Sequence, residues 1–381
     1  MTLLPNAQAA LAFLCGAQRA LRRVLTGAAV VMLTGLLTAC ADARYYLQSV
    51  SGHLQMMQVA QPIEQWLADE NTAPALKQRL ALAQRIRNFA VTELGLPDNA
   101  SYHRYADIKR RSIVWNVVAA SEFSLTLKTW CVPVAGCVSY RGYFDRLQAH
   151  EQAMALAADG LEVSVYGVPA YSTLGWLNWA GGDPLLNTFI DFPEGEMARM
   201  IFHELAHQVL YVKDDTLFNE SFATAVERLG GERWLQLHGS PTAKSEYAVL
   251  DGRRRQLRAL ALATRLRLAQ IYQQTEVPNS DKASLRKLKN QALQDFRDDY
   301  ARFKNNWGGY AAYDPWVAGV NNAALGAQAA YDELVPVFEL MFERADRDWP
   351  RFYADVKRLA QLPREARTQA LQQMATPHAS R

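Results

Sequence analysis

The sequence predicts an α+β fold, in which a mixed β-sheet with helical cover precedes a mostly α-helical part. Runs rich in β-branched and aromatic residues, bounded by turn residues, are confined to positions 112–171. Beyond Gly231, apolar residues recur at the spacing of a helix instead. Because half of the 381 residues are hydrophobic, the chain can bury the core of one large or two moderate domains. We expect a signal peptide at 1–39, the mixed-sheet and helical part at 40–195, and the helical part at 196–381.

Two helices, at residues 54–67 and 76–94, are expected ahead of the sheet, and the second ends at Gly95 before Pro97. The strands of the sheet share β-rich composition and flanking turn residues, and they are predicted at 113–118, 123–130, 138–144 and 161–168. A helix at 145–158 is expected to lie between the last two strands.

Two apolar stripes in the C-terminal part predict an antiparallel helical hairpin with a charged outer face. The first stripe comprises Leu257, Leu260, Ala261, Leu268 and Ile271, and the second Leu285, Leu288, Ala292, Phe296, Tyr300 and Phe303. Arginines at 253–255 can contact lipid headgroups or form a solvated face, and we prefer the solvated face.

The segment His203-Glu204-Leu205-Ala206-His207 lies in a predicted amphipathic helix. Residues four apart on a helix share one face, so the two imidazoles can hold one metal ion. Glu204, one residue further round the helix, can then reach a water on that ion. The alternative is a helix whose histidines only satisfy each other or the backbone. A charged residue inside an otherwise apolar segment makes that alternative weaker, because such a residue is rarely buried without a partner.

A third ligand can come from Glu220 or Glu227, which lie seven residues apart and can face the same way on one helix. Thr216 or Asn219 is expected to cap that helix, and the pair Gly230-Gly231 to end it. We prefer Glu220, because it falls where the chain has just turned back from the histidine helix. Glu227 is then a solvated or ion-paired residue, or an acceptor that orients a ligand histidine. Two His and one carboxylate, with water in the fourth position, form the open coordination of a catalytic zinc.

The motifs at 203–208 (HELAHQ) and 219–223 (NESFA) resemble the paired signatures of alanyl-aminopeptidase-type zinc enzymes, which are gluzincins. In that family a glycine stands in place of Ser221, and the second signature lies further from the first. A closer resemblance is to a bacterial group of predicted aminopeptidases, which shares both motifs, residues 170–175 (AYSTLG) and residues 321–323 (NNA).

This resemblance implies a thermolysin-like active-site helix and one zinc ion per chain. It assigns His203, His207 and Glu220 as the metal ligands and Glu204 as the general base.

The resemblance also implies substrate-binding residues. Gluzincin aminopeptidases stabilise the oxyanion with a tyrosine from the helical region after the metal site, and Tyr310 and Tyr313 match that description. We favour Tyr313, although both can be ordinary core aromatics. An edge strand holds the substrate backbone in that family. Residues 167–174 are the candidate for it, and a buried structural strand is the alternative.

Five further side chains are candidates for contact with substrate, and they are Tyr171, Ser172, Thr173, Asn321 and Asn322. The two asparagines can instead cap a helix.

The N-terminus predicts export. Three arginines within residues 19–23 precede a short apolar run, and small residues then lead to Cys40. A cysteine in this position resembles a bacterial lipobox, which implies acylation of Cys40 and a lipid anchor in a membrane. Ala41 implies the periplasmic face of the outer membrane. The apolar run is shorter than the ~20 residues that span a bilayer, so a transmembrane anchor is the weaker alternative.

Cleavage before Cys40 would remove three basic residues and leave 38 basic against 38 acidic residues. A net charge near zero gives no electrostatic reason to expect nucleic acid as a partner. Cys131 and Cys137 are the other cysteines of the mature chain, and in an oxidising compartment they are expected to form a disulfide.

The sequence therefore predicts a zinc-dependent peptidase of the cell envelope that acts on peptides, and the resemblance makes it an aminopeptidase. Asp183, Asp191 and Glu194 are candidates for pairing with a substrate amine. An envelope endopeptidase is one alternative, and a non-catalytic zinc-binding lipoprotein that acts as an assembly partner is another. The intact Glu204 argues against the second, because a structural zinc site has no use for a general base.

Overall fold

The computed structural model describes residues 43–132, 136–273, 281–331 and 333–375. The expected signal peptide and Cys40 lie outside these residues. The chain divides into two compact units, residues 1–54 and 55–381. In the first unit the described residues, 43–54, are helical and belong to a helix over 43–59. Among the residues that the structure describes, no helix is long and apolar enough to cross a membrane.

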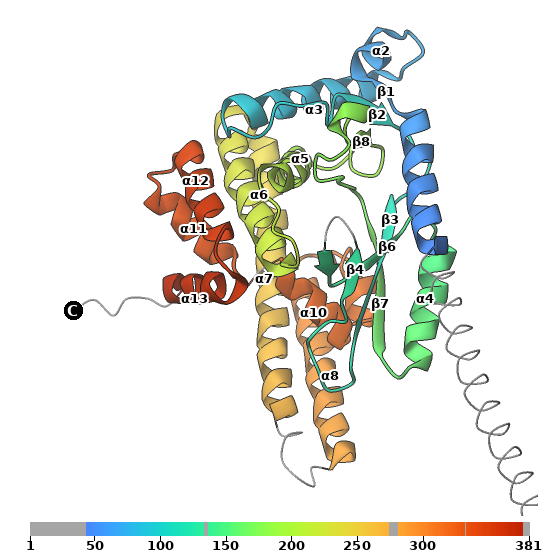
Figure 1. The fold of residues 1–381 in the computed structure, drawn as a ribbon, viewed down its shortest axis with the longest axis vertical. Coiled ribbons are helices and arrows are strands. Elements are labelled where there is room, and N and C mark those ends of the chain that lie inside the picture. Colours follow the sequence, from blue (N-terminus) through green and yellow to red (C-terminus); the bar gives the residue numbers. More distant parts are fainter. Residues whose placement is uncertain (1–42, 133–135, 274–280, 332, 376–381) are drawn as a thin grey trace, which may run out of the picture. The chain divides into compact units, whose positions relative to one another are not determined.

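The fold is α+β, but three small sheets replace the single mixed sheet that the sequence predicts (Figure 1). The first is antiparallel, with β3 (Val114–Ala120) between β6 (Arg141–Tyr143) and β7 (Glu162–Val168). In the second, β2 (Arg104–Ala106) pairs antiparallel with β1 (Gln61–Pro62) and parallel with β8 (Leu185–Leu186). The third is a hairpin of β4 (Trp130–Val132) and β5 (Gly136–Val138), in which a disulfide joins Cys131 to Cys137, as expected.

Several predicted elements are confirmed within a few residues. The strands expected at 113–118 and 161–168 are β3 and β7. The helix expected between the last two strands is α4 (Arg146–Ala158), and Asp145 caps it by accepting from two backbone N–H groups. The helix expected at 76–94 is α3 (Pro74–Thr92).

Other predicted elements are wrong. The strand expected at 123–130 is wrong except for Trp130, which begins β4, because Phe123 and Leu125 pack against the helical hairpin of the C-terminal part instead of filling a sheet face. The run 138–144 is divided between β5 and β6. The first helix is also divided, since the chain passes through β1 before α2 (Ile63–Ala68) begins after Pro62. Proline lacks a backbone N–H and suits this boundary.

The helices α5 (Glu194–Val209) and α6 (Thr216–His238) pack closely against each other and carry the paired motifs. Asp215, not Thr216 or Asn219, caps α6 by accepting from the backbone N–H of Phe218. The pair Gly230-Gly231 does not end α6, which continues for seven more residues. A Cβ added at Gly230 would lie 3.0 Å from the Phe202 ring, so these glycines permit the close approach of α5 rather than a helix end.

The predicted hairpin consists of α7 (Pro241–Gln273) and α8 (Lys282–Asn306), which run side by side in Figure 1. Most of the two stripes is buried, although Leu288 is exposed. The arginines at 253–255 are not a purely solvated face. Arg253 stacks on Tyr310, while Arg254 and Arg255 form ion pairs with Asp251.

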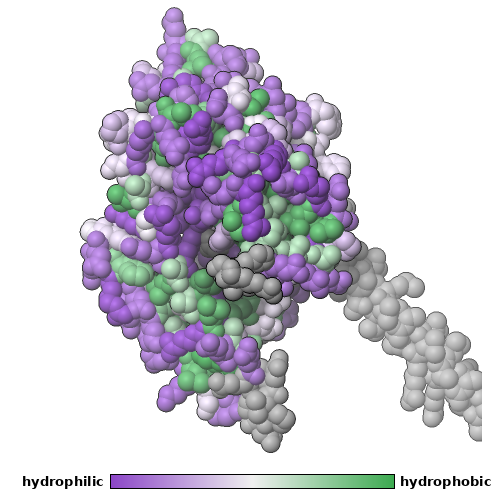
Figure 2. Space-filling model, turned by 90° about the vertical axis from the view of Figure 1, so that its left-hand side faces the viewer, coloured by the Kyte–Doolittle hydropathy of each residue, from purple (hydrophilic) through white to green (hydrophobic). Residues whose placement is uncertain are grey.

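Five shorter helices complete the described chain, and they are α9 (Asp314–Ala318), α10 (Asn322–Ala330), α11 (Val335–Arg344), α12 (Trp349–Ala360) and α13 (Arg364–Ala375). The largest hydrophobic core gathers around α5, where Met197, Ile201 and Leu205 are fully buried. On the face shown in Figure 2, hydrophilic side chains predominate and hydrophobic ones lie in scattered patches.

Candidate metal centre

The connection between α5 and α6 brings the two motifs face to face. Asn219 is buried, and its side chain both donates to and accepts from the backbone of Val212, at 2.7 and 2.8 Å. Ser221 is also buried, and its hydroxyl accepts from the backbone N–H of Leu334 ahead of α11. These bonds fix the turn and the start of α6, and so direct Glu220 toward α5.

His203, His207 and Glu220 form a buried cluster in which one ligand atom from each lies within 4.8 Å of the others. The two Nε2 atoms are 3.2 Å apart. Glu220 Oε2 is 3.3 Å from Nε2 of His203 and 3.6 Å from Nε2 of His207. The structure thus brings together the three residues that the sequence predicts as ligands. Two of them come from α5 and the third from α6.

This arrangement fits a tetrahedral metal ion. Zinc binds imidazole nitrogen and carboxylate oxygen at about 2.0–2.2 Å, which places two ligand atoms of a tetrahedron about 3.3 Å apart. The separations of 3.2, 3.3 and 3.6 Å are close to that value. Three ligands also leave one position open. The group can therefore hold a metal ion and leave room for water or substrate.

The carboxylates around the two histidines favour a positive charge at this place. Burial lowers the pKa of His203, but hydrogen bonds with Glu220 and Glu227 outweigh burial and raise that pKa well above its usual value. Burial raises the pKa of Glu220, yet His207 and His203 lower it well below the usual range. The protein therefore stabilises a positive charge between these side chains, which a metal cation can supply in place of a proton.

Glu227 does not join the ligand group. Its Oε2 lies 3.0 Å from Nδ1 of His203, on the ring atom that faces away from the cluster, and its Oε1 accepts from Arg199. Of the alternatives that the sequence leaves for Glu227, this geometry supports an acceptor that orients a ligand histidine.

Glu204 is half-buried beside the cluster. Burial raises its pKa, the two histidines lower it, and Glu220 and Glu227 raise it further, for a net increase. Within the described part of the chain, no hydrogen bond or ion pair occupies its carboxylate. A carboxylate with a raised pKa and free oxygens has the properties of a general base.

Four tyrosines from separate segments of the chain lie near this group, and the sequence patterns predict none of them. Tyr331 follows α10 and stacks on His203, with ring centroids 6.3 Å apart and planes 27° apart. Tyr211 lies edge-on to His207 at 6.4 Å. Tyr140 and Tyr166 come from the β6–β3–β7 sheet region. Burial and then the negative charge of Glu220 raise the pKa of three of these phenols, Tyr140, Tyr211 and Tyr331.

Tyr310 and Tyr313 lie in a different cluster. Tyr313 packs against Trp307 and Tyr310, next to the core of the α7–α8 hairpin. Arg253 stacks on Tyr310 at 4.3 Å. Both environments are those of the core aromatics that we named as the alternative, and a catalytic role for Tyr313 remains a prediction.

The segment 170–183 is held together by a buried carboxylate. Asp183 is fully buried, and both of its carboxylate oxygens accept from the backbone N–H of Thr173, at 3.1 and 3.0 Å. Burial, and to a smaller extent Glu204, raises the pKa of Asp183 to about 6. Asp183 therefore positions the loop and is not exposed to pair with a substrate amine. Ser172 accepts from the backbone N–H of Leu174, and Tyr171 packs on Phe144.

Gln208, which follows the second histidine, anchors the same loop. Its Oε1 accepts from Asn99 and Asn178, and its Nε2 donates to Ser101. The last residue of the HELAHQ motif thus connects α5 to this loop.

Asn321 and Asn322 are engaged within the protein. Asn321 caps α10 and donates to the carbonyl of Val163 on β7, which supports the capping alternative. Asn322 is fully buried and bonded to Tyr272 and to the backbone of Ser121 and Glu122.

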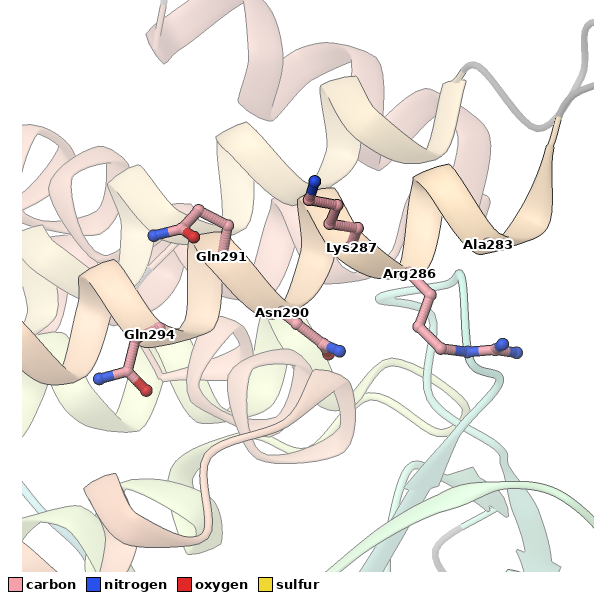
Figure 3. A pocket seen from close by; sticks show the side chains of 6 residues that line it. All are labelled: Ala283, Arg286, Lys287, Asn290, Gln291 and Gln294. Carbon is pink, nitrogen blue, oxygen red and sulfur yellow. The ribbon is translucent and has the colours of Figure 1, made fainter.

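A surface pocket on α8 is unrelated to this cluster. Figure 3 shows that its lining side chains, which include Arg286, Asn290 and Gln294, all project from one helix. None of them is among the candidate site residues.

Fold and site together define an α+β protein with a buried His–His–Glu group able to hold a metal ion. The model of a protein family described as "Putative aminopeptidase" matches residues 44–371, so the chain belongs to that family. Membership of this family suggests peptidase activity. No curated protein and no solved structure matches the chain.

Proposed function

We propose that the protein is a zinc-dependent peptidase, with His203, His207 and Glu220 as the metal ligands. The observation that carries the proposal is the buried cluster of these three side chains, at separations suited to tetrahedral zinc. When bound, zinc would polarise the scissile carbonyl and acidify the attacking water. Membership of the family supports a peptide as the substrate.

Glu204 would act as the general base. Its carboxylate accepts the proton of the attacking water and delivers it to the nitrogen of the leaving amine. The raised pKa of Glu204 suits both transfers, because a group that ionises closer to neutral pH can accept a proton and give it back.

Tyr331 is better placed than Tyr313 to stabilise the oxyanion. It stacks on a ligand histidine, and burial together with Glu220 keeps its hydroxyl protonated at neutral pH. A protonated phenol can donate a hydrogen bond to a developing negative charge.

The outer edge of β7 is the candidate for binding the peptide backbone. Among the described strands, β7 pairs with β3 alone, although Asn321 already donates to the carbonyl of Val163 at this edge. The negative charge of Glu220 contributes to raising the pKa of Tyr166 on the same strand. We therefore propose residues 162–168 for this role in place of residues 167–174, since β7 ends at Val168.

We further propose that acylation of Cys40 anchors the enzyme to the periplasmic face of the outer membrane.

The test compares Glu204→Gln with the wild type on free-amine peptides and on the same peptides N-acetylated. Glutamine keeps the size of the side chain but does not take up the water's proton, so turnover should fall by about 10²–10⁴-fold with zinc still bound. Glu232→Gln, at an exposed position of α6, is the control and should cleave like the wild type.

Cleavage of free-amine peptides alone indicates an aminopeptidase, and cleavage of acetylated peptides an endopeptidase. If the wild type cleaves neither set, or Glu204→Gln cleaves as fast as the wild type, the peptidase proposal is wrong.

A further inference from the structure

A buried arginine lies next to the outer face of the candidate metal centre. Arg199 stands one turn before His203 on α5, and only 4% of its side chain is exposed. Its Nη2 donates to Glu227 Oε1 on α6 at 2.5 Å, and its Nη1 to Asp251 Oδ1 on α7 at 3.4 Å. The other oxygen of Glu227 is 3.0 Å from His203 Nδ1. A continuous series of polar contacts therefore runs from α7 to a metal-binding histidine.

The surrounding helices are shaped to hold this arginine. A Cβ at Gly231 of α6 would lie 2.8 Å from Arg199 Cγ, so only glycine leaves room for the side chain. The ring of Tyr247 lies 5.8 Å from the guanidinium carbon. A buried cation is costly unless it is paired, and here two carboxylates pair with it.

The far end of this series is also fixed. Asp251 accepts from Arg254 as well, and Arg254 forms an ion pair with Glu196 of α5. Asp251 therefore holds the Nη1 side of the guanidinium in place. The Nη2 side can then orient Glu227.

The two ligand histidines differ in their outer contacts. His203 Nδ1 has Glu227 as its partner, whereas His207 Nδ1 is buried without a hydrogen-bond partner in the described part of the protein. Outer support for the metal centre thus comes through His203.

We propose that Arg199 is a positioning residue for the metal centre. It holds the Glu227 carboxylate so that this carboxylate accepts from the Nδ1–H of His203 and directs Nε2 toward His207 and Glu220. The inference rests on the proposed metal site, and it adds a residue outside both sequence motifs and a contribution from α7.

The experiment measures the zinc dissociation constant of the full chain by competition with a chromophoric chelator, without substrate. Outer-shell partners typically contribute 10–100-fold to metal affinity, so Arg199→Met should raise the dissociation constant by about that factor. Arg199→Lys keeps the charge but loses the fork that spans Glu227 and Asp251, and should raise it less. In a Glu227→Gln background, Arg199→Met should raise the zinc dissociation constant little further, because the two substitutions disrupt the same interaction.

Lys289→Met is the matched control. Lys289 is equally buried and ion-paired, with Glu162 at a different place in the core. This variant should lose stability but bind zinc with the wild-type dissociation constant.

The outcomes separate the inference from the proposed function. If the wild type binds no zinc, the proposed function fails. If the wild type binds zinc and Arg199→Met binds it equally well, or if Lys289→Met weakens binding to the same extent, the inference is wrong. Should Arg199→Met fail to fold, Arg199→Lys decides: a raised dissociation constant supports the inference, and an unchanged one overturns it.

Discussion

At the scale of single residues, the two motifs contain two kinds of side chain. Some form the candidate metal group, and others hold the local backbone in place. His203, His207 and Glu220 converge, while Asn219 and Ser221 of the second motif fix the turn and the next helix. The serine of the second motif thus has a structural role, because its hydroxyl accepts from the backbone N–H of Leu334.

The choice between two tyrosines can be tested at the residue scale. Removal of one oxyanion donor typically lowers kcat by about 10²–10³-fold, so Tyr331→Phe should have this effect with KM and zinc content little changed. Tyr313→Phe is the matched control, because Tyr313 packs in the hairpin cluster, and it should retain activity.

Steady-state kinetics with a cleaved peptide provide the measurement. If Tyr313→Phe lowers kcat and Tyr331→Phe does not, Tyr313 is the oxyanion donor, as the sequence analysis favours.

At the scale of elements, the connection between α5 and α6 is supported by the disulfide hairpin. The backbone N–H of Cys137 donates to Asp214 Oδ1 at 2.5 Å, and Gly136 approaches the same side chain. Asp214 lies between His207 and Glu220 in the sequence. The hairpin therefore contributes to holding the turn that brings these two candidate ligands together.

Gly136→Ala tests this contact. Gly136 has φ +77°, and a Cβ there would lie 2.3 Å from Asp214 Oδ1. Gly160→Ala is the matched control, because Gly160 has φ +81° with nothing within 4 Å of its Cβ.

The left-handed backbone alone should cost about 1–2 kcal/mol in both variants. Displacement of the exposed Asp214 carboxylate, with loss of its hydrogen bond from Cys137, should add about 0.5–1.5 kcal/mol in Gly136→Ala only. Denaturant unfolding measures both free energies, and equal losses would mean that the hairpin contact is not tight.

Across the whole molecule, the features that the sequence predicts correctly are those that arise from residue spacing within one segment of the chain. The i, i+4 histidines, the strands β3 and β7, and the hairpin stripes follow from periodicity within one segment. The tyrosines near the candidate metal centre do not, because Tyr140, Tyr166, Tyr211 and Tyr331 come from four separate segments of the chain with no shared motif. The pair Gly230-Gly231 predicts a helix end, and the structure contradicts this prediction. Glycine is favoured both at the end of a helix and where two helices approach closely, and only the position of α5 tells the two cases apart.

Membrane attachment is a prediction for the full-length molecule. Cys40→Ser should remove metabolic lipid labelling and leave the protein uncleaved or released from the membrane fraction, because serine lacks the thiol to which the lipid would be attached. The measurement is labelling with a radioactive fatty acid followed by fractionation. Labelling of Cys40→Ser at the wild-type level would exclude the lipoprotein assignment.

Metal analysis of purified variants decides whether His203, His207 and Glu220 hold a metal ion. The wild type should contain about one zinc per chain. His203→Ala and Glu220→Gln should lose it, whereas Glu227→Gln should keep most of its zinc, with weaker affinity, because Glu227 contacts only the outer nitrogen of His203. Full zinc content in Glu220→Gln, with loss in Glu227→Gln, would contradict the account.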